Sequence, residues 1–421
     1  MKIKIDHIAK VEGHTGFVGK IVDGKVEDAR MEVTQGARLI EGILIGRKIE
    51  DVPKIVSRIC GICPVVHTLT ALKALESCLH IRANREIILL RKLHNMGQIL
   101  SSHGLHLYFM VLSDFFGKRD SRDIMTRFKK EAKSTLFVRD FGNKVSEVIG
   151  GRAIHPISPQ IGGFSKWPEE KSLLELYGVK EEALKAAMTV ANIFSRLPYP
   201  DFHRQTEYLC LGNKRKKGGK KEYPIYDGVV ISNEGFRITP ERFLKTVREF
   251  REPGRVVKRV TFKDNTIMLG AIARVTNNFK YLNEQAKVFA KSAGFNEGIF
   301  NPFYNILAQA IELVHFTEEI GRLLEEYLRM RRKEKNVPYK TRGGQGLGTM
   351  EAPRGTLYHF YEIDPKGVVR DANIIPPTAQ FLLNLEQDLK FYLPEVKKKD
   401  RKKAVVMMVR AYDPCISCAV H

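Results

Sequence analysis

The chain lacks the features that define several classes of protein. Its 421 residues include six cysteines, which are too few for a disulfide scaffold. The longest apolar stretches, such as residues 105–112, fall well short of the ~18 residues that cross a bilayer. The N-terminal MKIKIDHIAK has neither a continuous apolar segment nor a small-residue cleavage site. We therefore expect no membrane span and no secretory signal in this chain.

Acidic residues are also scarce relative to basic ones. The 48 Asp and Glu against 70 Lys and Arg leave a net charge of +22, an excess that raises the question of nucleic-acid binding. The densest basic runs, residues 214–221 and 397–403, contain no interleaved aromatic residues on which bases could stack. We expect a loop and a solvated segment there, and no nucleic-acid partner. Docking of an acidic partner subunit is the second interpretation.

The hydrophobic pattern predicts a mainly α protein with a small β region (α+β). Residues 2–33 alternate around Asp23-Gly24, which indicates short strands within an N-terminal β region of about 1–35. Residues 223–237 indicate a strand and a turn, and residues 343–348 a glycine-rich loop. No clean linker is present, so we expect 1–421 to form a single unit. Helical spacing of apolar residues predicts helices over 37–49, 68–80, 86–116, 180–196, 305–331 and 379–393.

Four of the cysteines form two C-x-x-C pairs near opposite ends of the chain, Cys60 with Cys63 and Cys415 with Cys418. A fold that brings the pairs together creates a site with four thiolates. Structural zinc is one occupant of such a site, and a redox dithiol is the alternative for a single pair. The remaining two cysteines, at 78 and 210, have no neighbour at ligand spacing, and we expect them to be small buried hydrophobes.

Six motifs follow one another along the whole chain: VEGH at 11–14, ARLIEG at 37–42, RICGICPVVH at 58–67, SSHGLHLY at 101–108, EAPRG at 351–355 and DPCISCAVH at 413–421. In these motifs and in their order, the chain resembles the large subunit of nickel–iron hydrogenases. Its short length and lack of large insertions resemble the soluble cytoplasmic branch of that family. The resemblance implies the family's large-subunit fold with a helical core and a C-terminal metal-ligand segment over 410–421.

The resemblance implies the catalytic subunit of a hydrogenase, which cleaves dihydrogen reversibly and heterolytically into protons and electrons. The family's nickel–iron centre carries carbonyl and cyanide ligands on iron. By resemblance, Cys60 and Cys415 are terminal nickel ligands, while Cys63 and Cys418 bind both nickel and iron. Soft thiolates suit nickel, and a Lewis-acidic metal suits the polarisation of dihydrogen. A non-catalytic relative of this fold and a zinc-stabilised binding protein are the alternatives.

Four further residues acquire roles from the resemblance. Glu12 would relay protons beside a terminal thiolate. Arg354 would hold its guanidinium over the open metal face, with Asp413 orienting it. His67, four residues after Cys63, would form a hydrogen bond with a thiolate if a helix begins there. Taken alone, these residues would be ordinary ion-pair, turn and core residues.

A second metal site is implied near the C-terminus. Glu41 and His421 resemble ligands of a hard cation, usually magnesium, and the third ligand would be a backbone carbonyl near Asn373. That residue is polar where the family commonly has an apolar one. His103 and His106 lie three residues apart on one predicted helix face, and we expect them to be structural.

The chain has too few remaining cysteines to bind iron–sulfur clusters, so electrons must leave through a partner. The resemblance implies an iron–sulfur small subunit and further electron-transfer subunits that couple the reaction to NAD(P) or a similar soluble carrier. It also implies nickel-insertion factors, a maturation protease and a cytoplasmic location. The chain stops at His421, three residues after Cys418, where the family's maturation cleavage falls, and we expect this to be the mature form.

Overall fold

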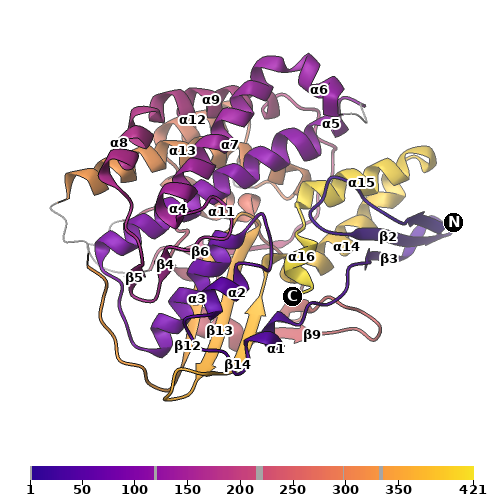
Figure 1. The fold of residues 1–421 in the computed structure, drawn as a ribbon. Coiled ribbons are helices and arrows are strands. Elements are labelled where there is room, and N and C mark those ends of the chain that lie inside the picture. Colours follow the sequence, from indigo (N-terminus) through magenta and orange to yellow (C-terminus); the bar gives the residue numbers. More distant parts are fainter. Residues whose placement is uncertain (1, 118–120, 215–220, 297, 331–334) are drawn as a thin grey trace.

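The computed structural model describes residues 2–117, 121–214, 221–296, 298–330 and 335–421. Long helices gather in one part of the molecule, and a three-stranded sheet covered by a helix forms another part (Figure 1). The N-terminal strands lie beside the C-terminal helices, so segments from the two ends of the sequence are neighbours (Figure 1). In the described part of the chain, no helix is long and apolar enough to cross a membrane.

The N-terminal segment forms an antiparallel sheet of β1 (Lys2–Ile5), β2 (Thr15–Val22) and β3 (Lys25–Val33). Asp23 and Gly24 form the turn between the last two strands, with φ of 47° and 76°. Such positive φ values are what a two-residue Asp-Gly hairpin turn requires. The sheet occupies the segment in which alternating residues predict strands.

The helical part is built around α13 (Asn305–Arg329), which packs against α4 (Arg85–Gly104) and α9 (Lys180–Phe194). Helix α4 also packs tightly on α7 (Lys129–Gly150). The predicted helix over 86–116 is interrupted, because the π-helical turn η1 (Leu105–Val111) follows α4 before α5 (Leu112–Phe115). The remaining helices of this part are α6 (Ser121–Arg127), α8 (Glu170–Gly178), α11 (Ala271–Asn278), η2 (Phe279–Tyr281), α12 (Glu284–Ser292) and η3 (Pro302–Tyr304).

The helix α3 (Pro64–Cys78) lies directly on an antiparallel sheet in the order β12-β13-β14. A Cβ added to any of the three alternate glycines of β12 would lie 2.0–2.7 Å from a backbone oxygen of α3. The prediction of a loop over 343–348 is therefore wrong: these glycines let a helix approach a strand closely. The strands are β12 (Gly344–Ala352), β13 (Gly355–Ile363) and β14 (Val369–Ile375).

Smaller elements complete the fold. The helix predicted over 37–49 is much shorter, because only α1 (Ile40–Leu44) is helical within it. The basic run over 397–403, predicted to be a solvated segment, includes the start of a helix at residue 401. Of the basic run over 214–221, residues 215–220 lie outside the described residues. The other helices of the fold are α2 (Val52–Val56), α10 (Pro240–Thr246), α14 (Pro377–Glu395), η4 (Lys398–Asp400), α15 (Arg401–Tyr412) and α16 (Ile416–Ala419). The short strands are β4 (Pro159–Gln160), β5 (Gly163–Phe164), β6 (Glu207–Gly212), β7 (Val229–Ser232), β8 (Arg237–Ile238), β9 (Val247–Phe250), β10 (Arg259–Phe262) and β11 (Ile267–Met268). The mainly helical α+β class is confirmed.

Candidate metal centre

The two C-x-x-C pairs meet in the interior. The sulfur atoms of Cys60, Cys63, Cys415 and Cys418 all lie within 4.8 Å of one another, and all four residues are buried and free of disulfides. The shortest sulfur–sulfur distances are 2.9 Å between Cys415 and Cys418, 3.2 Å between Cys63 and Cys418 and 3.3 Å between Cys60 and Cys415. In the described part of the chain, this is the one group of three or more histidine, cysteine, aspartate or glutamate side chains whose ligand atoms are close enough to hold a metal ion.

The start of α3 presents the first cysteine pair. Cys63 is the residue before the helix, and Pro64 occupies its first position, where a missing N–H costs nothing. The free N–H groups of Val65 and Val66 both donate to Oε1 of Gln98 on α4, at 2.6 and 3.3 Å. These bonds fix the beginning of α3 and with it the direction of the first pair.

The ARLIEG motif joins the two cysteine segments. Arg38 donates hydrogen bonds to the backbone carbonyls of Arg58 and Ile59, just before Cys60, and to that of Ser417, between the second pair. A single guanidinium therefore bridges segments that are more than 350 residues apart in the sequence. No role for Arg38 is predicted from the sequence, although its place in the ARLIEG motif is a signal.

Glu12 contacts the second cysteine pair through its backbone and its side chain. Its carbonyl accepts a hydrogen bond from the N–H of Ile416 at 3.0 Å, and its Oε2 accepts one from the N–H of Ser417 at 2.9 Å. The same Oε2 lies 3.1 Å from the sulfur of Cys415, whose thiol donates to it. A carboxylate is thus held directly beside a thiol, as a proton acceptor must be.

Arg354 and Asp413 form a buried ion pair next to the thiols. Nε and Nη2 of Arg354 donate to the carbonyl and the Oδ1 of Asp413, at 2.7 and 2.9 Å. Burial lowers the pKa of Arg354, but the nearby Asp413 and the cysteines of the site raise it by more. The net pKa is therefore raised, and the guanidinium stays charged. Among the described residues its Nη1 is buried without a hydrogen-bond partner, and the side chain lines a cavity of about 10 Å³ together with Cys63, Cys415 and Cys418.

His67 faces the second cysteine pair rather than Cys63. Its Nε2 lies 3.5 Å from the sulfur of Cys418, and its Nδ1 lies 3.1 Å from Nε2 of His359. Nδ1 of His359 in turn lies 2.7 Å from the hydroxyl of Tyr361. Burial lowers the pKa of His67 to about 3, so the ring is neutral at neutral pH. No role for His359 and Tyr361 is predicted from the sequence, although alternate positions on one strand share a face.

The C-terminal residue is buried beside Glu41. Nε2 of His421 lies 3.0 Å from the carbonyl oxygen of Ile374 and 3.6 Å from Oε1 of Glu41, while its Nδ1 contacts the carbonyl of Cys418. The N–H of Ile374 donates to the same Glu41 oxygen at 2.8 Å. The carbonyl that faces His421 therefore belongs to Ile374, one residue beyond the predicted Asn373.

Asn373 takes part through its side chain. Its amide oxygen accepts a hydrogen bond from Nζ of Lys258 at 3.1 Å, and its amide N–H donates to Oε1 of Glu249 at 2.7 Å. Lys258 also donates to both carboxylate oxygens of Glu41, at 2.7 and 3.0 Å. Burial raises the pKa of Glu41, but His421 and Lys258 lower it to about 2. The sequence does not predict these contacts of Lys258 and Glu249, because charged residues are frequent throughout the chain.

The two histidines of SSHGLHLY contact protein groups. Nε2 of His103 lies 2.8 Å from a carboxylate oxygen of Glu312, and Nε2 of His106 lies 2.7 Å from the carbonyl of Arg410. Nδ1 of His106 contacts the amide oxygen of Gln309. The structural role expected for both histidines stays a prediction.

The donor set of the four cysteines suits a soft metal centre. Hydrogen bonds from the neighbouring thiols, Cys415 first, lower the pKa of Cys60 well below its usual value, whereas burial raises the pKa values of Cys415 and Cys418. Four buried thiols at these distances cannot all ionise without a cation among them, and ligation requires the thiolate. A set of four sulfurs suits zinc and iron, and soft thiolates also suit nickel.

Comparisons with known proteins distinguish between these metals. The sequence model of the family described as nickel-dependent hydrogenase matches residues 38–136 and 256–421. The alpha subunit of sulfhydrogenase 1 from Pyrococcus furiosus is 34% identical, over 100% of this chain and 98% of that protein. The alpha subunit of sulfhydrogenase 2 from the same organism is 33% identical, over 100% and 99%.

Solved structures share the fold over the whole chain. An NAD+-reducing [NiFe]-hydrogenase in its dihydrogen-reduced state has a TM-score of 0.88 at 26% identity, covering 100% of this chain and 99% of that one. A variant of the [NiFeSe] hydrogenase of Desulfovibrio vulgaris Hildenborough has a TM-score of 0.83 at 23% identity, with the same coverage. At this identity the likeness establishes a shared fold and nothing more. The chain belongs to the nickel-dependent hydrogenase family, with the fold of the large subunit and four converging cysteines at its centre.

Proposed function

We propose that the four cysteines hold a nickel–iron centre at which dihydrogen is cleaved heterolytically and reversibly. The observation that carries the proposal is the convergence of four buried thiols with a carboxylate and a guanidinium in a member of this family. Cys60 and Cys415 would bind nickel, and Cys63 and Cys418 would bind nickel and iron. When bound, such a centre supplies the Lewis acid that polarises the substrate and a path for its electrons. The carbonyl and cyanide ligands of its iron belong to the same proposal.

The chain's own residues would manage the proton and the charge. Glu12 would accept the proton, because its Oε2 lies 3.1 Å from the sulfur of Cys415. Arg354 would stabilise negative charge that develops in the cavity, since a fixed and desolvated cation needs no reorganisation during the reaction. Asp413 would orient Arg354 through its two hydrogen bonds. His67 would hold Cys418 by a hydrogen bond from a neutral ring.

A hard cation near the C-terminus is the second part of the proposal. Adjacent ligands at about 2.1 Å from an octahedral magnesium ion lie about 3 Å apart. Nε2 of His421 lies 3.0 Å from the oxygen of Ile374 and 3.6 Å from Oε1 of Glu41, which fits that spacing. These three groups would hold the ion, and Asn373 would act through its side chain on Lys258 rather than through its carbonyl.

The electrons would leave through an iron–sulfur small subunit, because four of the six cysteines belong to the proposed centre. Further electron-transfer subunits would pass them to NAD(P) or a similar carrier in the cytoplasm. The likeness to an NAD+-reducing hydrogenase over the full chain supports this choice. We propose that the whole chain acts as a single unit, matured by nickel-insertion factors and a protease.

Metal analysis of the purified complex tests the proposal. We expect nickel and iron in a ratio of about 1:1 in the large subunit, and exchange of dihydrogen with deuterium oxide. Cys415→Ser should abolish both, whereas Cys78→Ser should leave both intact, because burial raises the pKa of Cys78 to about 12 and its thiol lies outside the cluster. Zinc in place of nickel would contradict the proposal.

A further inference from the structure

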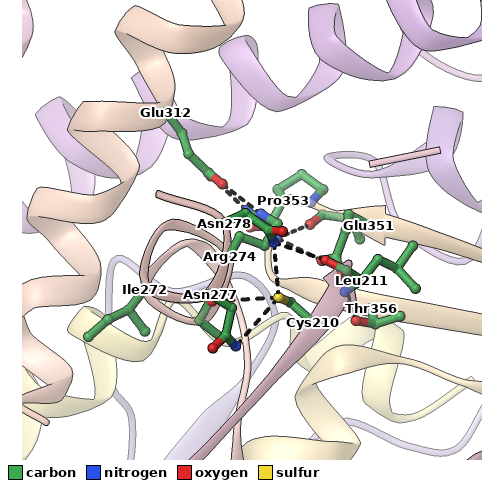
Figure 2. A network of polar contacts seen from close by, with 12 residues as sticks. Cys210, Leu211, Ile272, Arg274, Asn277, Asn278, Glu312, Glu351, Pro353 and Thr356 are labelled. Carbon is green, nitrogen blue, oxygen red and sulfur yellow. Dashed lines mark hydrogen bonds and ion pairs between the residues drawn. The ribbon is translucent and has the colours of Figure 1, made fainter. Parts of the chain in front are cut away.

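A buried ion network, shown in Figure 2, contacts the backbone immediately before Arg354. Its centre is Arg274 on α11, whose side chain is completely buried. Nε and Nη2 of Arg274 donate to the two carboxylate oxygens of Glu312, at 2.6 and 2.7 Å. Its Nη1 donates to Oε2 of Glu351 at 3.1 Å. A guanidinium in this two-pronged arrangement has a fixed plane and a fixed orientation.

The same guanidinium holds the backbone immediately before Arg354. Nη1 of Arg274 donates to the carbonyl of Ala352 at 2.8 Å, and Nη2 donates to the carbonyl of Pro353 at 2.9 Å. With the three bonds to carboxylates, these two use all five N–H groups of the side chain. The preceding carbonyl, that of Glu351, accepts a hydrogen bond from the amide of Asn95 at 3.0 Å. Three consecutive carbonyls are therefore fixed by side chains.

The held segment is a tight hairpin turn. Ala352 pairs with Gly355 across β12 and β13, so Pro353 and Arg354 are the two residues of the turn. Gly355 has φ of 130°, and a Cβ there would lie 2.6 Å from the Cβ of Leu269. The turn is thus packed without spare room at Gly355, which follows Arg354, and Arg274 fixes the two residues that precede Arg354.

The partners of Arg274 are themselves held by other elements. Oε1 of Glu351 accepts hydrogen bonds from the N–H of Leu211 at 2.8 Å and from the hydroxyl of Thr356 at 2.7 Å. Glu312 accepts hydrogen bonds from Tyr223 and His103. Since every partner has a second attachment, the network is rigid as a whole.

Stability alone does not account for these contacts. Replacing a buried ion pair by well-packed apolar residues is often neutral or stabilising. Arg91 is equally buried and pairs with Glu76 through two hydrogen bonds, yet its contacts do not include residues 351–354. What distinguishes Arg274 is that its remaining N–H groups hold the turn beside the thiols.

We infer that Arg274 is a positioning residue: through the carbonyls of Ala352 and Pro353 it fixes where the guanidinium of Arg354 lies over the metal centre. The inference rests on the proposed role of Arg354. Its physical basis is that a displacement of about 1 Å of a group that acts on the reacting atoms can cost about 100-fold in rate. Glu312 and Glu351 act one step further back, by orienting Arg274.

The test is Arg274→Lys in the metal-loaded enzyme with its partner subunits. Lysine keeps the positive charge but cannot bind two carboxylates and two carbonyls in one plane. We expect kcat for dihydrogen oxidation to fall by about 100-fold while KM changes by less than about twofold. The nickel and iron content should match that of the wild type. Arg91→Lys is the matched control and should leave kcat within about twofold.

A double-mutant cycle separates positioning from general damage. In an Arg354→Lys background, Arg274→Lys should cost less than about twofold, because its effect passes through Arg354. If Arg274→Lys does not load metal, Glu351→Gln is used in the same cycle, with an expected loss of about tenfold in the wild-type background. Additive losses would overturn the inference while leaving the role of Arg354 in place. Wild-type kcat in Arg354→Lys alone would overturn the proposed role of Arg354 as well.

Discussion

Glu12 shows how one residue combines a structural and a chemical contact. Its backbone carbonyl and its side chain both bind the segment of the second cysteine pair, so its position is fixed twice. The contact that matters for chemistry is the 3.1 Å distance from Oε2 to the sulfur of Cys415. Replacing the carboxylate by an amide keeps the shape and removes the ability to carry a proton.

We therefore expect Glu12→Gln to impair proton transfer while metal loading survives. Hydrogen–deuterium exchange should fall by about 100-fold or more, within the contribution usual for a general base. Nickel and iron content, measured on the same sample, should stay near that of the wild type. Glu27→Gln, on the exposed face of β3, is the control. Full exchange activity in Glu12→Gln would place the proton acceptor elsewhere.

A buried histidine makes the stability depend on pH. His94 is fully buried, and neither of its ring nitrogens has a hydrogen-bond partner among the described residues. Burial lowers its pKa from 6.5 to about 3. Below pH 6.5 the unfolded chain binds a proton at this ring and the folded chain does not, so stability falls as the pH falls from 6.5 towards 3.

At pH 5 the loss from this one ring amounts to about 2 kcal/mol, and His94→Leu should remove it. The difference in unfolding free energy between pH 7.5 and pH 5, measured with denaturant, should shrink by about that amount. His203→Leu, at an exposed histidine, is measured in parallel as the control for removing a ring. An unchanged pH dependence in His94→Leu would show that this ring is protonated in the fold.

At the scale of elements, glycine decides how closely segments approach. The alternation of glycine along β12 looks like a loop in the sequence, because glycine is common in turns. In the structure these positions face α3, whose backbone leaves no room for a Cβ. The sequence could not indicate this, since the partner helix lies more than 260 residues away. Helices α9, α13 and α14 lie close to their predicted ranges, whereas α7 has no counterpart among the predicted helices. The helix predicted over 37–49 is longer than α1, because its flanks continue the apolar spacing without helical geometry.

Gly13 has the corresponding role at the metal centre. It has φ of 84°, and a Cβ there would lie 2.7 Å from the Cβ of Ile416. We expect Gly13→Ala to push the VEGH segment away from the second cysteine pair and to lower the nickel content by at least about half. The reason is steric, because neither backbone can give way without losing the bridge from Glu12 to Cys415.

Gly24→Ala provides the matched control for this substitution. Gly24 has a similar φ of 76°, but a Cβ there meets nothing within 4 Å. The control therefore carries the conformational cost of about 1 kcal/mol without the collision. Its metal content should equal that of the wild type. Equal metal loading in Gly13→Ala would mean that the contact with Ile416 is not needed.

At the scale of the whole molecule, the centre is assembled from the two ends of the chain. Motifs near the termini predicted the cysteines and the residues beside them, because each motif is local in sequence. The supporting residues were not predictable in this way. Lys258 meets Glu41 across 217 positions, and Arg274 reaches Pro353 across 79, with no local pattern to mark either contact. Because charged residues are frequent in this chain, only the fold shows which of them contact the proposed metal ligands or the turn before Arg354.

The C-terminal residue completes this assembly. His421 is buried and lies beside α1 and α16, where Figure 1 places the end of the chain. Its ring contacts the carbonyl of Cys418 on one side and that of Ile374 on the other. The ring thus fixes the backbone of a proposed metal ligand against β14, even before any cation is considered.

We expect His421→Ala to lower both metal content and stability, because it removes the ring that contacts the carbonyls of Cys418 and Ile374, and the loss of one buried hydrogen bond costs about 1–3 kcal/mol. His421→Gln can still donate to one carbonyl but is a poor substitute for an imidazole ligand. If the ring acts by hydrogen bonding alone, Gln should restore nickel content in part and a magnesium chelator should affect neither protein. If the ring also binds a hard cation, the chelator should destabilise the wild type and leave His421→Gln unchanged. Nickel and iron per chain and the midpoint of thermal unfolding measure these outcomes. Wild-type values for both in His421→Ala would show that the centre closes without its last residue.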